Sequence, residues 1–320
     1  MYSVRVCREL SECGVLWQAM VPPVTVFDLW ETRSCFQAHF DRPPNFVVVD
    51  GESGPLGLLP LSYIDESDSF GYFPGETWMG ETWLEQNRIV AADERIYRLL
   101  MERCPPRTHL RYLVPEALEV DPSAEVDEVG FLFHPGRYNY AMADYWQEFS
   151  GKSRKRLRRE LGAIEAMGVE YRYDDPNDVG VLLEMNLDAY GERSYFQDDR
   201  FRGGFCSFVG LFGRKGWLRI TTALVGGRVA AVDVGVIYNR AYTLIAGGTN
   251  PQFPGIAKLI NLHHMGWACS QRLAAVDFLC GSFGWKDRFH LSPRPLYQLT
   301  AGPRTAGTGV FARAEAADVI

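Results

Sequence analysis

Hydrophobic residues between positions 217 and 281 fall into short strand-like runs, followed by one run with helical spacing. Gly226-Gly227 separates the first two runs, and this dipeptide is typical of a two-residue hairpin turn. Asn239-Arg240 separates the second run from a third, at residues 241–247. The pattern predicts three antiparallel strands, then a loop, a helix and a short buried strand at residues 276–279.

The loop before the predicted helix contains two prolines and a glycine, at residues 250–255. A helix that starts in this way leaves several backbone N–H groups unpaired, and these groups and the helix dipole favour an anion such as a phosphate. The spacing fits neither a Walker loop nor a dinucleotide fingerprint. Two interpretations stay open, an ordinary helix start and a diphosphate site. The residues that would form the site are Pro254, Gly255, Ile256, Ala257 and Lys258.

The order strand, helix, aromatic-rich helix, hairpin, strand, helix, strand occurs twice along the chain. The repetition predicts an α/β (α+β) fold with two domains, residues 1–143 and 144–320, each with a mixed, mostly antiparallel sheet flanked by helices. Residues 115–130 carry six acidic side chains and are expected to form a surface connection. The loop of the first copy contains Glu76, Glu81 and Glu85, which would repel a diphosphate, so only the second copy is expected to bind an anion.

A basic amphipathic helix is predicted between the two copies. Leu157, Leu161 and Ile164 form its apolar stripe, and Gly168 is expected to end it. Its first two turns carry six cations: Lys152, Arg154, Lys155, Arg156, Arg158 and Arg159. They form either a solvated face or a wall that binds an acidic substrate or a cofactor phosphate, in which case Arg154 and Arg158 are candidate contacts.

Composition narrows the class of protein. The chain has 320 residues, 47% of them hydrophobic, and a formal net charge of −7. The acidic balance argues against a general nucleic-acid binder. The seven cysteines are scattered without metal-binding spacing, so no metal site is expected. We expect reduced thiols and a cytoplasmic location. We also expect no membrane span and no signal peptide.

Asp233 is the most unusual residue of the predicted strands. It interrupts VAAVDVGVI, a run that is otherwise apolar on both faces, where a carboxylate is unfavourable unless it is paired or functional. A buried carboxylate would suit a general base, and a core carboxylate paired with an arginine or a backbone N–H is the alternative.

Other candidate groups come after the last buried strand. Lys286 and Arg288 could hold a substrate carboxylate or phosphate, or be ordinary loop cations. Tyr297 lies in the last predicted strand and could protonate a leaving thiolate, or be a half-buried strand residue. His263 falls on the apolar stripe of the 256–268 helix and is interpreted as a core histidine.

Several segments resemble a known family. KSRKRLRRELGAIEAMGVEYR is similar to the linker helix of the Fem-type aminoacyltransferases. Three other segments resemble the CelD-like acetyltransferase domain of the GNAT superfamily: NFVVVDGESGPLGLLPLSY, the segment from Trp217 to Pro251, and VDFLCGSFGWKDRF. The resemblance covers about residues 25–300. It implies two tandem GNAT-like domains and transfer of an acyl group to an amine or a hydroxyl.

Three functions follow as hypotheses. The first is an N-acyltransferase that uses acetyl-CoA or another acyl-CoA and transfers the acyl group to an amine or a hydroxyl of a small-molecule, glycan or peptide acceptor. This acceptor could be acidic, or related to the cell envelope or to a polysaccharide. The second is a Fem-like enzyme that takes its aminoacyl group from charged tRNA. The acidic net charge of the chain disfavours this hypothesis, and the cations at residues 152–159 favour it. The third is an inactive protein that keeps the fold to bind a glycan or a peptide.

Overall fold

The computed structural model describes residues 2–117, 121–281 and 286–301, which form two compact units. The first unit contains the described residues up to 129, residues 198–208 and those from 295 onward; the second contains residues 130–197 and 209–294. The units are therefore built from interleaved segments. The boundary expected from the sequence, between residues 143 and 144, stays a prediction.

A four-stranded antiparallel sheet organises the start of the first unit. Its order is β1 (Ser3–Cys7), β2 (Phe46–Gly51), β3 (Gly54–Leu59) and β8 (Val90–Ala91). Three helices belong to this unit: α1 (Leu10–Met20), α2 (Trp30–Phe40) and α3 (Glu94–Glu102). Apolar residues of β2, α1 and α3 are buried together in one core.

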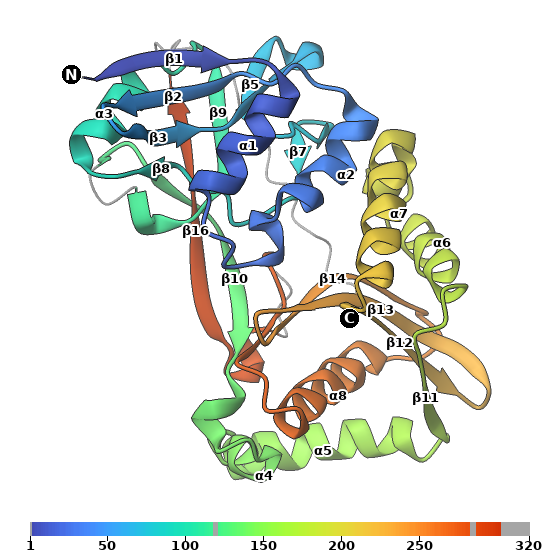
Figure 1. Cartoon of the computed structure of the whole chain (residues 1–320). Coiled ribbons are helices and arrows are strands. Elements are labelled where there is room, and N and C mark those ends of the chain that lie inside the picture. Colours follow the sequence, from blue (N-terminus) through green and yellow to red (C-terminus); the bar gives the residue numbers. More distant parts are fainter. Residues whose placement is uncertain (1, 118–120, 282–285, 302–320) are drawn as a thin grey trace. The chain divides into compact units, whose positions relative to one another are not determined.

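The remaining strands of the first unit have the order β16 (Ser292–Ala301), β9 (Thr108–Leu113), β5 (Ser69–Tyr72) and β4 (Leu61–Ile64). A small hairpin is formed by β6 (Thr77–Trp78) and β7 (Glu81–Thr82). β5 and β9 pair in parallel, whereas the pairs β16–β9 and β4–β5 are antiparallel. Figure 1 labels β5, β7, β9 and β16.

The segment expected to be a surface connection contains a strand, β10 (Glu125–Phe133). Arg111 on β9 offsets two of the acidic residues of this strand: its guanidinium contacts Asp127 at 2.9 Å and Glu128 at 3.3 Å. The expectation for residues 125–130 was therefore wrong. Tertiary contacts overrode the local composition.

The second unit contains a six-stranded run of sheet. Its order is β11 (Val169–Tyr173), β12 (Leu218–Val225), β13 (Arg228–Tyr238), β14 (Ala241–Thr249), β15 (Ala275–Asp277) and the end of β10. All neighbours are antiparallel except β14 and β15. Gly226 and Gly227 have positive φ of 56° and 76°, so the predicted hairpin turn is confirmed.

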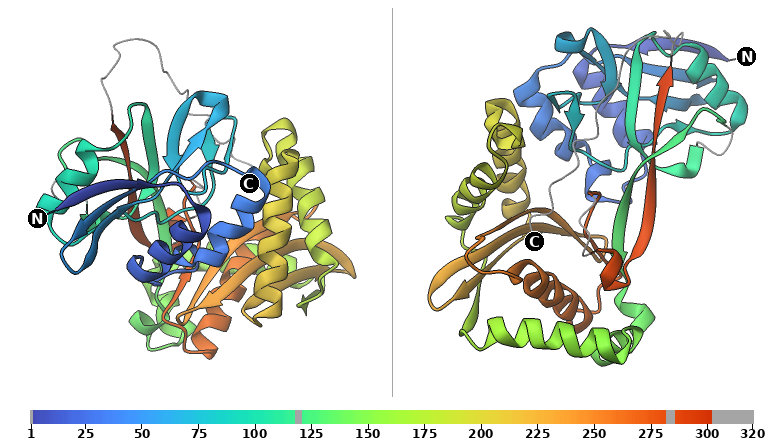
Figure 2. Two further views of the ribbon diagram at one scale, coloured as in Figure 1. Left: turned by 45° about the horizontal axis from the view of Figure 1, so that its top comes forward. Right: turned by 180° about the vertical axis from the view of Figure 1, so that it is seen from behind.

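Helices cover this sheet on two sides (Figures 1 and 2). α8 (Ile256–Ser270) lies on one face with α5 (Gly151–Glu165) beyond it, and α6 (Asp178–Tyr190) lies on the opposite face. The other helices are α4 (Met142–Tyr145) and α7 (Asp199–Arg214). The apolar stripe of α5 is buried as predicted, and Gly168 follows the helix with φ of 80°. No helix among the described residues is long and apolar enough to cross a membrane.

Candidate active site in the second unit

The start of α8 has the glycine turn that the sequence predicts. Gly255 is the N-cap residue with φ of 88°, and no side chain caps the helix. The Ile256 N–H donates to the Phe253 carbonyl at 3.1 Å, whereas the N–H groups of Gly255 and Ala257 have no acceptor in the described part of the chain. One of the three amides expected to bind a diphosphate is therefore used within the turn, and two are available.

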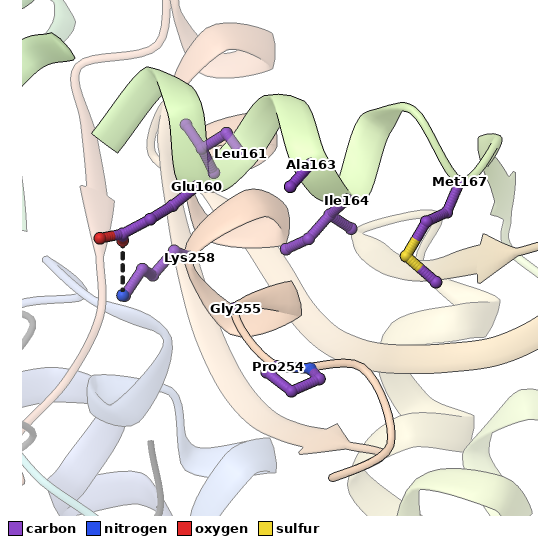
Figure 3. A pocket seen from close by; sticks show the side chains of 8 residues that line it. All are labelled: Glu160, Leu161, Ala163, Ile164, Met167, Pro254, Gly255 and Lys258. Atoms are coloured by element: carbon purple, nitrogen blue, oxygen red, sulfur yellow. Dashed lines mark hydrogen bonds and ion pairs between the residues drawn. The ribbon is translucent and has the colours of Figure 1, made fainter. Parts of the chain in front are cut away.

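A groove of about 360 Å³ lies beside this turn (Figure 3). Pro254, Gly255 and Lys258 line it on one side, so three of the five predicted cofactor residues border an open space. Ile256 is buried in the core instead. The opposite wall belongs to α5 and is formed by Glu160, Leu161, Ala163, Ile164 and Met167.

The groove has both an apolar wall and an ion pair. Ile164 lies so close to Gly255 that a Cβ there would come within 2.9 Å of the Ile164 Cδ1 atom. The Lys258 Nζ is 3.1 Å from Glu160 Oε2, and both side chains are partly exposed. The cation predicted for a diphosphate is present, but Glu160 holds it.

The pairing of β14 with β15 ends before β14 does, because β15 is only three residues long. They pair in parallel only from Ala241 to Thr243, opposite Ala275 to Asp277. β14 continues to Thr249, and past Thr243 no described strand pairs with the edge that had faced β15. An unpaired strand edge offers backbone donors and acceptors to an extended ligand.

Asp233 lies in the middle of β13, directly opposite Thr221 of β12 and Gly247 of β14. Its Oδ2 atom is 2.9 Å from the Nε2 atom of His264 on α8, and the two side chains are 5% and 0% exposed. Its Oδ1 atom occupies the space that a side chain at Gly247 would fill. No arginine or lysine of the described chain pairs with Asp233, so the partner of the buried carboxylate is a histidine.

His264 was missed by the sequence interpretation, which selected His263 as the core histidine. The apolar stripe of α8 passes between the two positions, and the burial of one rather than the other depends on how the helix rotates over the sheet. His263 is half-buried: its ring stacks on Tyr171 at 3.8 Å between centroids, and its Nε2 atom lies 3.0 Å from the Tyr173 hydroxyl. Burial, with smaller contributions from His264 and Arg219, lowers the pKa of His263 to about 4.

Tyr242 completes the surroundings of the Asp233–His264 pair. Its ring centroid is 5.0 Å from that of His264. It occupies the space that a side chain at Gly235 would need. Burial, together with the charge of Asp233, raises the pKa of Tyr242 well above its ordinary value, so the phenol stays protonated.

Residues 151–287 match the family model of an acetyltransferase (GNAT) domain. The chain carries a GNAT-family domain. This domain contains the groove, the α8 turn, Asp233 and His264. A search of the curated proteins found no match.

Solved structures are similar to nearly the whole chain. A conserved protein of unknown function from Bacteroides thetaiotaomicron is 13% identical, with 92% of this chain and 99% of that chain covered and a TM-score of 0.57. FemX is 8% identical, with 92% and 96% covered and a TM-score of 0.56. The C-terminal domain of a putative lysylphosphatidylglycerol synthetase from Agrobacterium fabrum is 11% identical, with 91% and 92% covered and a TM-score of 0.52. These likenesses confirm the predicted mixed, mostly antiparallel α/β fold.

The cations of α5 lie mainly outside the groove. The residues of this helix that line the groove begin at Glu160, after the basic turns. Arg154 donates to the Trp146 carbonyl at 3.4 Å, and the Arg158 guanidinium lies 5.4 Å from the Trp146 ring centroid. Lys152, Lys155, Arg156 and Arg159 are exposed. This arrangement fits the solvated face better than a wall around the groove.

Two other predicted residues are placed close to the end of the GNAT domain. Lys286 is 2% exposed, and its ammonium donates to the carbonyls of Phe278, Leu279 and Cys280 at 2.9–3.0 Å. Such an ammonium stabilises the chain after β15, which favours a structural role over substrate binding. Arg288 is exposed.

Tyr297, the other predicted catalytic residue, belongs to the first unit. It lies on β16 opposite Leu113 of β9 and packs, partly buried, against the core of that unit. Tyr297 and the Asp233–His264 pair therefore belong to different units. The role of Tyr297 as a proton donor stays a prediction.

Proposed function

We propose that the chain is an N-acyltransferase that takes its acyl group from an acyl-coenzyme A, with acetyl-CoA as the first candidate donor. The observation that carries the proposal is the edge of β14 that extends beyond its pairing with β15, in the strand that leads to the glycine-started helix α8. The amide portion of coenzyme A is extended and can pair with the free edge of β14, while its diphosphate can accept from the amides of Gly255 and Ala257.

Asp233 is the proposed general base. The lone pair of the acceptor amine attacks the thioester carbonyl carbon, the C–N bond forms, and the C–S bond breaks. The proton of the amine passes to Asp233, and coenzyme A leaves as a thiolate. Asp233 then releases this proton, and the proton ends on the thiolate to give the thiol. The amide product and free coenzyme A together account for every atom of the amine and the thioester.

Calorimetric titration with coenzyme A tests the donor site. Gly255→Glu places a negative charge beside the proposed diphosphate, whereas Gly255→Gln adds nearly the same volume and the same backbone strain without charge. We expect the glutamate variant to bind at least about tenfold more weakly than the glutamine variant, an effect of about 1.4 kcal/mol.

Gly216→Glu is the matched control, because Gly216 also has a positive φ, 69°, with open space around it. It should bind coenzyme A as the wild type does. Equal affinity of the two Gly255 variants, or no binding by the wild type, would contradict the proposed donor.

The Fem-like alternative, in which charged tRNA supplies the acyl group, is supported by the cations on α5 and by the fold that FemX shares. The apolar wall of the groove and the position of these cations outside it favour coenzyme A.

A further inference from the structure

The Asp233–His264 pair is asymmetric. One carboxylate oxygen, Oδ2, lies 2.9 Å from the imidazole, whereas Oδ1 has no hydrogen-bond partner in the described chain and lies over Gly247. Gly247 is an exposed position of β14, on the part of the strand that runs beyond its pairing with β15. Asp233 therefore has one oxygen committed to α8 and one directed to the free part of β14.

Glycines on two strands make this arrangement possible. A Cβ at Gly247 would collide with Oδ1 of Asp233, and a Cβ at Gly235 would come within 2.6 Å of the Tyr242 hydroxyl. Each glycine thus opens a space that a polar side chain of the next strand fills. A sheet selected for packing alone would be expected to fill these positions with β-branched residues.

Three buried polar atoms in or beside the Asp233–His264 pair have no hydrogen-bond partner in the described chain. They are Thr221 Oγ1, Tyr242 Oη and His264 Nδ1. Their side chains are 0% exposed. Each such atom lowers stability by about 1–3 kcal/mol relative to a satisfied one, so the cluster is unfavourable for folding. Costly polar clusters of this kind occur preferentially at functional sites.

We propose that His264 is a positioning residue of the acyl-transfer centre: it donates its Nε2–H to Asp233 and so holds Oδ1 toward the acceptor amine at Gly247. This inference rests on the proposed function. A donor on Nε2 fixes the imidazole in one tautomer, with Nδ1 unprotonated. Tyr242 supports the ring from the sheet side, 5.0 Å away.

The groups that face Asp233 come from two neighbouring strands and from α8. Asp233 is faced by Thr221 from β12, by Gly247 and Tyr242 from β14, and by His264 from α8. His264 is the only side chain that lies within hydrogen-bond distance of Asp233 among the residues that the structure describes. Removing this contact should therefore leave Oδ2 without a partner and allow the carboxylate to turn away from Gly247.

The test compares His264→Phe, which keeps a ring but removes the donor, with His264→Gln, whose amide can donate in place of Nε2. Turnover of acetyl-CoA with ethanolamine is followed by release of the coenzyme A thiol from pH 5.5 to 9. We expect His264→Phe to lower kcat by about 30-fold or more across this pH range. The KM for acetyl-CoA should change less than about twofold, and His264→Gln should recover most of the rate.

Two further readouts separate this role from a purely structural one. Long-range ¹H–¹⁵N spectra should show His264 as the Nε2–H tautomer in the wild type, and calorimetry should show unchanged coenzyme A affinity in both variants. A His264→Phe variant with wild-type kcat, an Nδ1–H tautomer in the wild type, or no recovery by glutamine would overturn the inference. Absence of coenzyme A binding by the wild type would instead defeat the proposed function, and the positioning role with it.

Discussion

Two adjacent histidines of the second unit lie in different electrostatic surroundings. His263 and His264 are neighbours on α8, yet one packs against tyrosines at the margin of the sheet and the other pairs with a buried carboxylate. The pKa of His263 is lowered to about 4, mainly by burial. Because the unfolded chain has a histidine pKa near 6.5, it binds more protons than the folded chain between these values.

Stability should therefore fall as the pH drops from about 6.5 to 4 and be fully present above that window. His263→Phe keeps the stacking on Tyr171 without the titrating group. We expect it to remove on the order of 2 kcal/mol of the acid destabilisation between pH 7 and pH 4, measured by urea unfolding at each pH. Parallel curves for the variant and the wild type would show that His263 does not cause the acid sensitivity.

Helix α5 controls the start of α8 at the scale of elements. Its apolar stripe packs toward the glycine turn through Ile164, and its Glu160 holds the lysine that would otherwise meet an anion. Lys258 and Glu160 are 26% and 42% exposed on their side chains, so the ion pair is weak and can exchange partners. α5 thus forms one wall of the groove and competes with the ligand for its cation.

Glu160→Gln should increase coenzyme A affinity by about two- to fivefold, because Lys258 is released and a nearby negative charge is lost. The increase should shrink at high salt. Glu165→Gln removes the same charge from the same helix outside the residues that line the groove, and should change affinity less. Titration calorimetry at 50 mM and 500 mM salt measures both variants, and equal gains would indicate a long-range charge effect instead of a local release.

The charge of the whole molecule bears on the choice of donor. The net charge is −7, while six cations are gathered on the first turns of α5. A polyanion such as tRNA would be repelled at long range and attracted only locally. An acyl-CoA has far fewer charges and meets less of this repulsion.

We therefore expect no measurable tRNA binding at 150 mM salt by fluorescence anisotropy. Weak binding at 20 mM salt should decrease steeply as salt is added. Replacing Lys155, Arg156 and Arg159 by glutamine should abolish this weak binding and leave coenzyme A affinity unchanged. Tight tRNA binding at 150 mM that depends on these cations would favour the Fem-like donor.

Local pattern determined much of the second unit. The turn between β12 and β13 has positive φ at both Gly226 and Gly227, which glycine adopts without strain. The hairpin is therefore indicated by the dipeptide itself. The stripe Leu157, Leu161 and Ile164 has the period of a helix, and Gly168 ends it because glycine adopts positive φ without strain. Asp233 stood out because a carboxylate in an apolar strand needs a partner.

Only the tertiary structure decided which partner that is and what the surrounding space contains. Whether His263 or His264 turns toward Asp233 depends on the rotation of α8 over the sheet, which a period of 3.6 residues leaves undetermined when both positions border the stripe. Residues 125–133 form a strand in which Arg111, distant in sequence, offsets two of the carboxylates. The ion pair of Lys258 with Glu160 joins two helices 98 positions apart. Contacts between residues so far apart depend on how the elements pack, and no local pattern encodes them.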